Sequence, residues 1–264
     1  MRVVAVDWSG SVSARGRTTW VAEVRGDELV FLEAGRTAAQ VAELLVAWAN
    51  DDPELVVGLD FAFSMPLWFL RERGWAGAHD LWRDAAENAD TWLRDCPPPF
   101  WGRAAQWTRP ALPAGATWFR RTEELLRTLP ETRPKSVFQV GGAGAVGTGS
   151  LRGMAVLATL HAAGFSIWPF DPPSLPRAVE TYPRALTRAV RKSDPLARLA
   201  YLDALDWPLN PTLRELAAST EDAFDAAVSA RVMAAHAGDL QTLPEPADPV
   251  ARLEGWIWLP PQPQ

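Results

Sequence analysis

Four aspartates occupy positions from which their carboxylates could be gathered into one site. Asp7 ends the first apolar run of the chain, and Asp60 ends another continuous apolar run. If these runs are adjacent strands of one sheet, the two carboxylates lie side by side at its edge. Asp222 and Asp225 are three residues apart near the start of the last long helix, so they share a face. Crowded carboxylates repel each other, and a divalent cation that prefers oxygen ligands, Mg²⁺ or Mn²⁺, relieves the repulsion.

A cation held in this way would support phosphodiester chemistry, because two-metal sites clamp the attacking and the leaving oxygen. Glu180, in the middle of an apolar strand, is a further candidate for the same site. The aspartates also have structural interpretations: an Asp after a strand can form an Asx turn, and Ser219-x-x-Asp222 matches a capping box. Asp225 lies past that cap, among Ala and Val. We therefore expect Asp7, Asp60 and Asp225 to meet in one pocket, helped by Asp222 or Glu180.

A glycine-rich loop at 141–149 is a candidate phosphate contact. Its Gly142–Gly147 segment matches G-x-G-x-x-G, but Thr148-Gly149 delay the expected helix to Ser150, which is unlike a dinucleotide-binding turn. A P-loop would carry Lys in place of Thr148. The loop could instead present free N–H groups to a phosphate together with Arg152, or it could be a plain flexible connection.

The segment 94–121 combines five arginines and one aspartate with interleaved Trp and Phe. Arginine neutralises phosphate and aromatic rings stack on bases, so this composition is typical of a single-strand or distorted-duplex contact. The alternative is that the aromatic side chains pack an irregular subdomain while the arginines are solvated. The candidate substrate-binding residues are Ser9, Arg103, Arg120, Arg121, Arg152 and Lys192; a turn hydrogen bond for Ser9 and a solvated surface position for Lys192 explain these two equally simply.

The elements that would position these residues are of the α/β type. The first 63 residues predict the order β-β-β-α-β: strands at 2–6, 18–24 and 28–33, a helix from Thr37 to about Asn50, and a strand at 55–59. Gly26-Asp27 indicates a tight turn between the second and third strands. Residues 64–135 interrupt the pattern with Pro-, Trp- and Arg-rich sequence, which we interpret as an inserted helical subdomain of a single 1–264 domain. Its helical pieces are expected near 65–73, 78–94 and 118–128.

The α/β pattern resumes after the insertion. We expect strands at 137–140, 165–170 and 178–182, and a short strand at 255–259. Helices are expected at 150–163, at 183–205 with a break at Asp194-Pro195, and at 219–237. Pro169 is unfavourable in a central parallel strand.

The amino-acid composition excludes several classes of protein. The chain has 264 residues, a formal net charge of −6, 14 Trp and a single cysteine, and 24 of its 26 basic residues are Arg. One cysteine excludes an internal disulfide and a Cys-rich zinc site, and fits a reducing compartment. No apolar run approaches 18 residues and the first residues do not form a signal peptide, so we expect a cytoplasmic globular protein without a membrane partner. The sequence gives no indication of the oligomeric state.

The acidic motifs and the order of the elements resemble those of known protein families. The order β-β-β-α-β followed by an acid-bearing helix resembles the ribonuclease H-like fold, and residues 221–226 resemble the D-A-x-D-A motif in the last helix of RuvC-type resolvases. More closely, the chain resembles the family known as domain of unknown function 429, predicted RNase H-like nucleases, at 4–10, 58–69, 99–102, 136–154, 167–171, 179–184, 221–230 and 254–258.

The resemblance implies metal ligands at Asp7, Asp60, Asp222 and Asp225, with Glu180 as a further one. It also implies an RNase H-like mixed sheet flanked by helices, from which the 64–135 insertion departs. The leading hypothesis is a metal-dependent nuclease that uses Mg²⁺ or Mn²⁺. Two alternatives remain open: an actin-like phosphotransferase or ATPase with phosphate and Mg²⁺ loops at 7–10 and 60–64, and a non-catalytic nucleic-acid-binding module.

Overall fold

A mixed β-sheet forms the centre of the computed structural model, which describes residues 1–9 and 19–261. The described strands are β1 (Arg2–Asp7), β2 (Trp20–Arg25), β3 (Glu28–Ala34), β4 (Leu55–Leu59), β5 (Ser166–Ile167) and β6 (Arg177–Glu180). They form one six-stranded sheet in the order β3-β2-β1-β4-β6-β5. The pairs β3-β2 and β2-β1 are antiparallel, and the pairs β1-β4, β4-β6 and β6-β5 are parallel. The carboxyl ends of β1, β4 and β6 therefore meet at one edge.

Short-range sequence signals account for the first half of this sheet. Gly26 adopts φ +63° in the turn between β2 and β3, a conformation that costs glycine little. Thr37 caps α1 (Ala38–Asp51) in a capping box with Gln40, as its position before an amphipathic run predicts. The predicted order β-β-β-α-β is observed.

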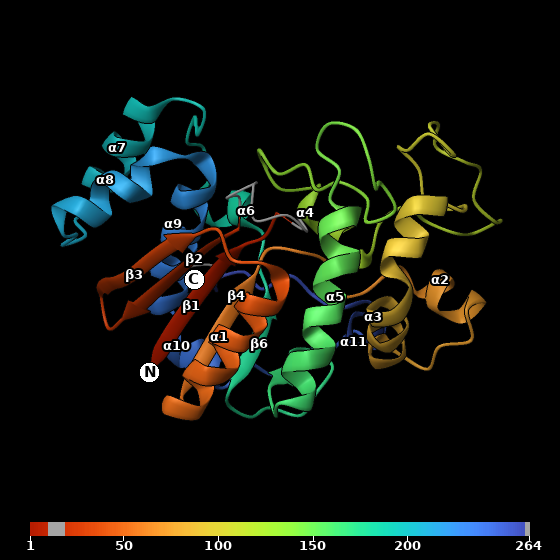
Figure 1. The fold of residues 1–264 in the computed structure, drawn as a ribbon, viewed down its shortest axis with the longest axis horizontal. Helices are drawn as coiled ribbons and strands as arrows, with labels where there is room; N and C mark the ends of the chain where they lie inside the picture. Colours follow the sequence, from red (N-terminus) through yellow and green to blue (C-terminus); the bar gives the residue numbers. More distant parts are fainter. Residues whose placement is uncertain (10–18, 262–264) are drawn as a thin grey trace.

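Helices cover both faces of the sheet, as Figure 1 shows. On one face α1 packs beside α5 (Gly147–Ala162), and α3 (Ala78–Asp95) packs against α5. On the other face α9 (Glu221–Ala235) contacts β1, β2, β3 and β4, with α8 (Pro211–Ser219) and α7 (Pro195–Ala204) outside it. Each face has its own hydrophobic cluster. None of the helices in the described ranges is long and apolar enough to cross a membrane.

The predicted insertion contains α2 (Leu67–Glu72), α3 and α4 (Arg121–Leu126). Its aromatic side chains pack on one another and on Phe138 beyond it; for example, the Phe69 ring lies 5.9 Å from Phe100 and 5.2 Å from Phe138, centroid to centroid. These rings belong to the same hydrophobic cluster as the α1 and α5 face of the sheet. Many of the aromatic residues of this segment therefore have a packing role.

Several element boundaries differ from the sequence predictions. Residues 137–140 are not a strand but a turn, with an isolated bridge between Trp101 and Gln139. Helix α5 begins at Gly147, before the predicted Ser150, because the Gly147 N–H donates to Gln139 O at 2.9 Å. A Cβ there would lie 2.2 Å from the Val137 carbonyl oxygen, so the close approach requires glycine. The strand predicted at 165–170 is only two residues long, consistent with the missing N–H of Pro169.

The predicted C-terminal helices are also divided differently. The helix predicted at 183–205 is two helices, α6 (Pro183–Thr187) and α7, since Arg188 adopts φ +53° and Asp194 caps a new helix. The long helix is capped by Thr220 rather than Ser219, which ends α8. Two short helices follow, α10 (Ala237–Gln241) and α11 (Ala251–Glu254). The strand predicted at 255–259 is reduced to a bridge between Ile257 and Glu180.

Candidate functional site

Two strand ends bring the first pair of carboxylates together. Val6 is paired with Leu59 in the parallel β1–β4 ladder, and the Asp60 N–H donates to Val6 O at 3.1 Å. Val3 and Ala5 pack in the cluster on the α9 face, so strand alternation directs Asp7 to that face as well. Asp60 follows Val56 and Gly58 in the same alternation. The parallel register thus places both aspartates at the edge of the sheet, next to α9.

Helix α9 supplies the other pair. The Thr220 side chain accepts a hydrogen bond from the Ala223 N–H and starts the helix, so that Asp222 and Asp225 lie in its first two turns. Asp225 is 8% exposed. The negative charges of Asp60, Asp225 and Asp222 all act on Asp7 and raise its pKa. We call these four residues the acidic cluster.

The pKa values of all four aspartates of the acidic cluster are raised above the ordinary value. Loss of surrounding water raises the pKa of Asp60 to about 8, and the charge of Asp225 adds to the effect. Loss of water also raises the pKa of Asp7 well above its ordinary value, followed by the charge of Asp60. The pKa values of Asp222 and Asp225 are raised for the same leading reason. The cluster therefore resists being fully ionised unless a positive charge lies beside it.

Lys192 provides part of that positive charge. Its ammonium donates a hydrogen bond to Asp225 Oδ2, and its charge counteracts the rise in the pKa of Asp225. The other oxygen, Asp225 Oδ1, is buried and has no hydrogen-bond partner among the described residues. Buried carboxylate oxygens are almost always satisfied. Carboxylate oxygens are the ligands that a hard divalent cation prefers, and a cation site at this oxygen stays a prediction.

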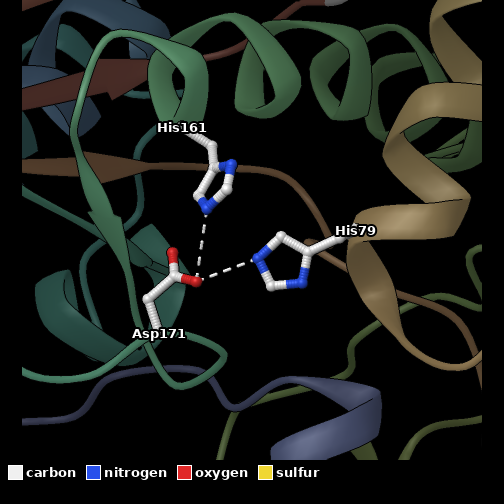
Figure 2. A group of neighbouring side chains, drawn as sticks. All are labelled: His79, His161 and Asp171. Atoms are coloured by element: carbon white, nitrogen blue, oxygen red, sulfur yellow. Dashed lines mark hydrogen bonds and ion pairs between the residues drawn. The ribbon is translucent and has the colours of Figure 1, made fainter.

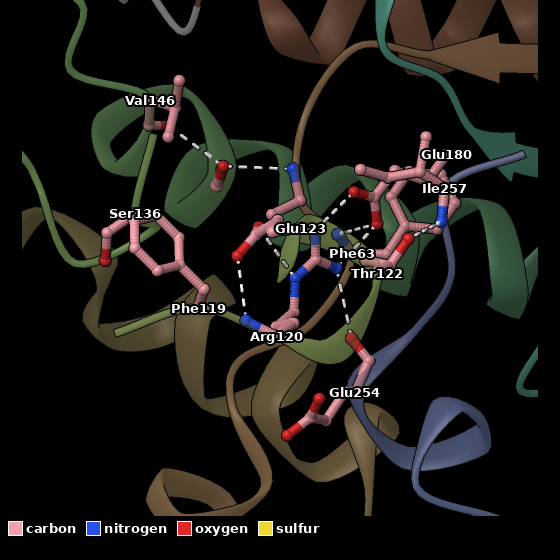
Figure 3. A network of polar contacts seen from close by, with 12 residues as sticks. Phe63, Phe119, Arg120, Thr122, Glu123, Ser136, Val146, Glu180, Glu254 and Ile257 are labelled. Atoms are coloured by element: carbon pink, nitrogen blue, oxygen red, sulfur yellow. Dashed lines mark hydrogen bonds and ion pairs between the residues drawn. The ribbon is translucent and has the colours of Figure 1, made fainter. Parts of the chain in front are cut away.

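Glu180 is engaged elsewhere, although it also ends a strand at this edge. Ala178 packs in the hydrophobic cluster opposite α9, so alternation turns Glu180 away from Asp7. Figure 3 shows its carboxylate bound by the Arg120 guanidinium, with Nη2–Oε1 and Nη1–Oε2 distances of 2.5 and 2.8 Å. The Phe63 N–H also donates to Glu180 Oε2 at 2.9 Å. Glu180 is therefore ion-paired within the protein, and its charge also raises the pKa of Asp60, so a metal contact of Glu180 stays a prediction.

Arg120 likewise has a different role from the expected substrate contact. It is 1% exposed and also binds Glu123 Oε1 and the Glu254 backbone oxygen. Burial lowers its pKa, but Glu123 and Glu180 outweigh this and hold the pKa above its ordinary range. A buried arginine between two carboxylates is a structural cross-link, although Arg120 also lines the cavity described below.

A cavity of about 190 Å³ opens beside Asp60, on the side of the sheet edge that carries Glu180. Ser9, Tyr182 and Lys135 line it, together with Ala145, Val146 and Gly149 from the glycine-rich loop. The loop thus lies across a cavity from a strand-end carboxylate, where it was expected to face a phosphate. Lys135 was missed by the sequence reasoning. A usable signal existed, because the chain has only two lysines: Lys135 lines this cavity and Lys192 binds Asp225 of the acidic cluster.

The remaining candidate substrate residues have protein partners. Ser9 Oγ forms a hydrogen bond of 2.9 Å with Thr19 Oγ1 at the start of the next described segment. Arg103 donates to Val140 O and Thr148 Oγ1, which fastens the glycine-rich loop to the insertion. Arg121 pairs with Asp248, and Arg152 pairs with Asp90.

Within the basic aromatic segment, Arg109 stacks on Trp118 at 4.4 Å from the ring centroid. Trp107 stands apart because it is 69% exposed. Stacking within the protein thus occupies part of the surface expected to contact bases, and a nucleic-acid contact here stays a prediction.

Comparisons with known proteins give one match. The model of a family described as "Protein of unknown function (DUF429)" matches residues 6–249. No curated protein and no solved structure matches the chain significantly. The matched range includes all four residues of the acidic cluster, Lys192 and the cavity-lining loop.

Proposed function

The chain belongs to this DUF429 family of proteins of unknown function, and we propose that it is a metal-dependent hydrolase of phosphodiester bonds in nucleic acid. The proposal rests on the acidic cluster, and above all on Asp225 Oδ1, which is buried without a partner beside three other carboxylates. Mg²⁺ or Mn²⁺ fits this all-oxygen set. Asp7, Asp60 and Asp225 would hold the ion, with Asp222 at the more exposed end.

The chain's own residues suit this chemistry. A bound divalent cation supplies Lewis-acid chemistry, in that it activates water as a nucleophile and offsets charge on phosphorus. Lys192 holds the Asp225 carboxylate in place through Oδ2 and leaves Oδ1 for a ligand. Lys135 and the glycine-rich loop line the cavity next to Asp60, where a phosphate would meet positive charge and backbone N–H groups.

The topology supports an RNase H-like interpretation of the core. Three antiparallel strands lead through α1 into a parallel strand placed next to β1, and an acid-bearing helix returns to the same edge. This arrangement agrees with the motif resemblance at 4–10, 58–69 and 221–230. The insertion, absent from ordinary RNase H enzymes, would then shape the substrate groove.

The decisive experiment is cleavage of labelled RNA, DNA and branched-junction substrates by the full chain with Mg²⁺, with Mn²⁺ and with EDTA. We expect cleavage only with metal, and a fall of at least about 100-fold in Asp7→Asn, Asp60→Asn and Asp225→Asn. Asp203→Asn is the matched control, because Asp203 is exposed and pairs with Arg214 rather than with a residue of the cluster. Folded cluster variants as active as the control would refute the proposal.

The Lys192–Asp225 ion pair favours one second candidate, a nucleic-acid-binding module without turnover. In that case the lysine itself would neutralise the carboxylate and no metal would be required. Binding measured by fluorescence anisotropy would then persist in EDTA and in the acid-to-amide variants. Metal-dependent binding that these variants lose would exclude this candidate.

A further inference from the structure

A second group of ligand-type side chains lies outside the acidic cluster. His79 is in the first turn of α3, His161 is in the last turn of α5, and Asp171 follows β5. Their ligand atoms all lie within 4.8 Å of one another. Figure 2 shows both imidazoles pointing their Nε2 atoms at the same carboxylate oxygen, Asp171 Oδ1. His79 thus meets two residues that follow it by 82 and 92 positions in the sequence.

The surrounding contacts hold the three side chains in place. The Ile167 N–H donates to Asp171 Oδ2 at 2.8 Å, which fixes the carboxylate and leaves Oδ1 facing the histidines. The His79 ring packs 4.7 Å from the buried Trp82 ring and 4.6 Å from the His161 ring, centroid to centroid. Burial raises the pKa of Asp171, but hydrogen bonds from His79 and the Ile167 N–H outweigh it and keep the pKa below its ordinary value. The carboxylate is therefore ionised.

We propose that His79, His161 and Asp171 bind one Zn²⁺ ion, which ties α3 to α5 and to the end of β5. Two imidazole nitrogens and one carboxylate oxygen are the ligand types that zinc takes, and its fourth position is often water. The histidine side chains are 40% and 46% exposed, so solvent can reach that position.

The distances leave room for an ion after a small movement of His79. His161 Nε2 lies 3.5 Å from Asp171 Oδ1, which is long for a hydrogen bond. It is close to the roughly 3.3 Å edge of a tetrahedron with metal–ligand bonds of about 2.0–2.1 Å. His79 Nε2, at 2.9 Å from the same oxygen, requires only a few tenths of an ångström of movement. The softer nitrogen ligands also separate this site from the all-oxygen acidic cluster, which suits Mg²⁺.

The test is titration of the metal-free full chain with ZnCl₂ by calorimetry, in excess Mg²⁺ and in an Asp225→Asn background to silence the acidic cluster. We expect one zinc ion per chain, and at least tenfold weaker binding in both His79→Ala and His161→Ala. His236→Ala is the matched control, because His236 pairs with Asp239 elsewhere in the chain and its loss should change nothing.

Thermal unfolding provides a second measurement. Zinc should raise the melting temperature of the unaltered chain and of His236→Ala, but not that of the other two histidine variants. Either histidine variant suffices if the other fails to fold, and Asp171→Asn tests the third ligand. Absence of zinc binding, or binding that survives both histidine substitutions, would overturn the proposal.

Discussion

In the metal-free protein, burial and the neighbouring carboxylates both disfavour the ionised form of Asp60. It ends a buried strand, and it lies beside three other carboxylates, so its pKa rises to about 8. A cation can bind only the ionised form and must displace the proton. The protonation of this one residue therefore links pH to metal binding.

We expect the Mg²⁺ affinity of the full chain to increase by roughly tenfold or more per pH unit between pH 6 and 8, with at least about one proton released per ion bound, because the pKa of Asp7 is raised as well. Above pH 8 the dependence should flatten, because Asp60 is then ionised without metal. Calorimetry at several pH values, in buffers with different ionisation enthalpies, measures both the affinity and the proton release. An affinity independent of pH over this range would contradict the assignment.

Asp60 should also lower the stability of the metal-free chain. Since its folded-state pKa is raised, the folded chain keeps a proton between about pH 4 and 8 that the unfolded chain has lost, so stability falls as the pH rises through this window. Asp60→Asn should therefore raise the free energy of unfolding by about 1–3 kcal/mol at pH 8.5 and change it little at pH 4. Urea unfolding without metal measures this. If Asp60→Asn instead lowered the free energy of unfolding at pH 8.5, the ionised Asp60 carboxylate would not be unfavourable in the folded chain.

At the scale of elements, α9 positions the acids only because it lies close to the sheet. Gly58 in β4 faces this helix, and a Cβ there would be 2.5 Å from Met233 Sδ and 2.7 Å from Thr181 Cγ2. Glycine thus permits the separation at which Asp222 and Asp225 reach the ends of β1 and β4. The Thr220 cap then sets where the helix starts.

Gly58→Ala should cost about 1–3 kcal/mol of stability, because Met233 and Thr181 must move to admit the methyl group. It should also weaken Mg²⁺ binding, since α9 carries two residues of the acidic cluster. Gly238→Ala on α10 is the matched control, as nothing lies within 4 Å of the added Cβ. Urea unfolding and calorimetry of both variants make the comparison. If the two variants lost equal stability and equal Mg²⁺ affinity, the position of α9 would not depend on Gly58.

At the scale of the whole molecule, the Arg120 network joins parts of the chain that no single element connects. Arg120 precedes α4 in the insertion, Glu180 ends β6 in the sheet, and Glu254 ends α11 near the C-terminal end of the described chain. The Arg120 guanidinium contacts the Glu180 carboxylate, the Glu254 backbone oxygen and the Glu123 carboxylate (Figure 3). This buried network fastens the insertion to the sheet edge beside the cavity.

Arg120→Met should destabilise the chain by about 3–5 kcal/mol, because it leaves two carboxylates buried without their partner. Adding Glu180→Gln and Glu123→Gln should recover part of the loss by removing the unpaired charges. Arg214→Ala, which breaks an exposed pair, should cost less than about 1 kcal/mol. Denaturant unfolding of the four proteins tests this, and a loss in Arg120→Met no larger than in Arg214→Ala would contradict it.

The sequence by itself determined the elements that carry the acidic cluster. Apolar runs that end in Asp7 and Asp60, and two acids three apart on a helix, follow local periodicities of two and 3.6 residues, and these can be read without the fold. The mixed sheet and its first five elements were predicted for the same reason.

Only the tertiary structure decided the partners of these residues. Glu180 binds Arg120 and Lys192 binds Asp225, across 60 and 33 positions of the chain. Lys135 and the glycine-rich loop line one cavity with Asp60, which is more than 70 positions away from them in the sequence. The histidines of α3 and α5 met Asp171 in the same way. Such contacts depend on how the layers pack and on which face of the sheet a side chain occupies. No local pattern contains that information, because the pairing is decided by burial of the whole core.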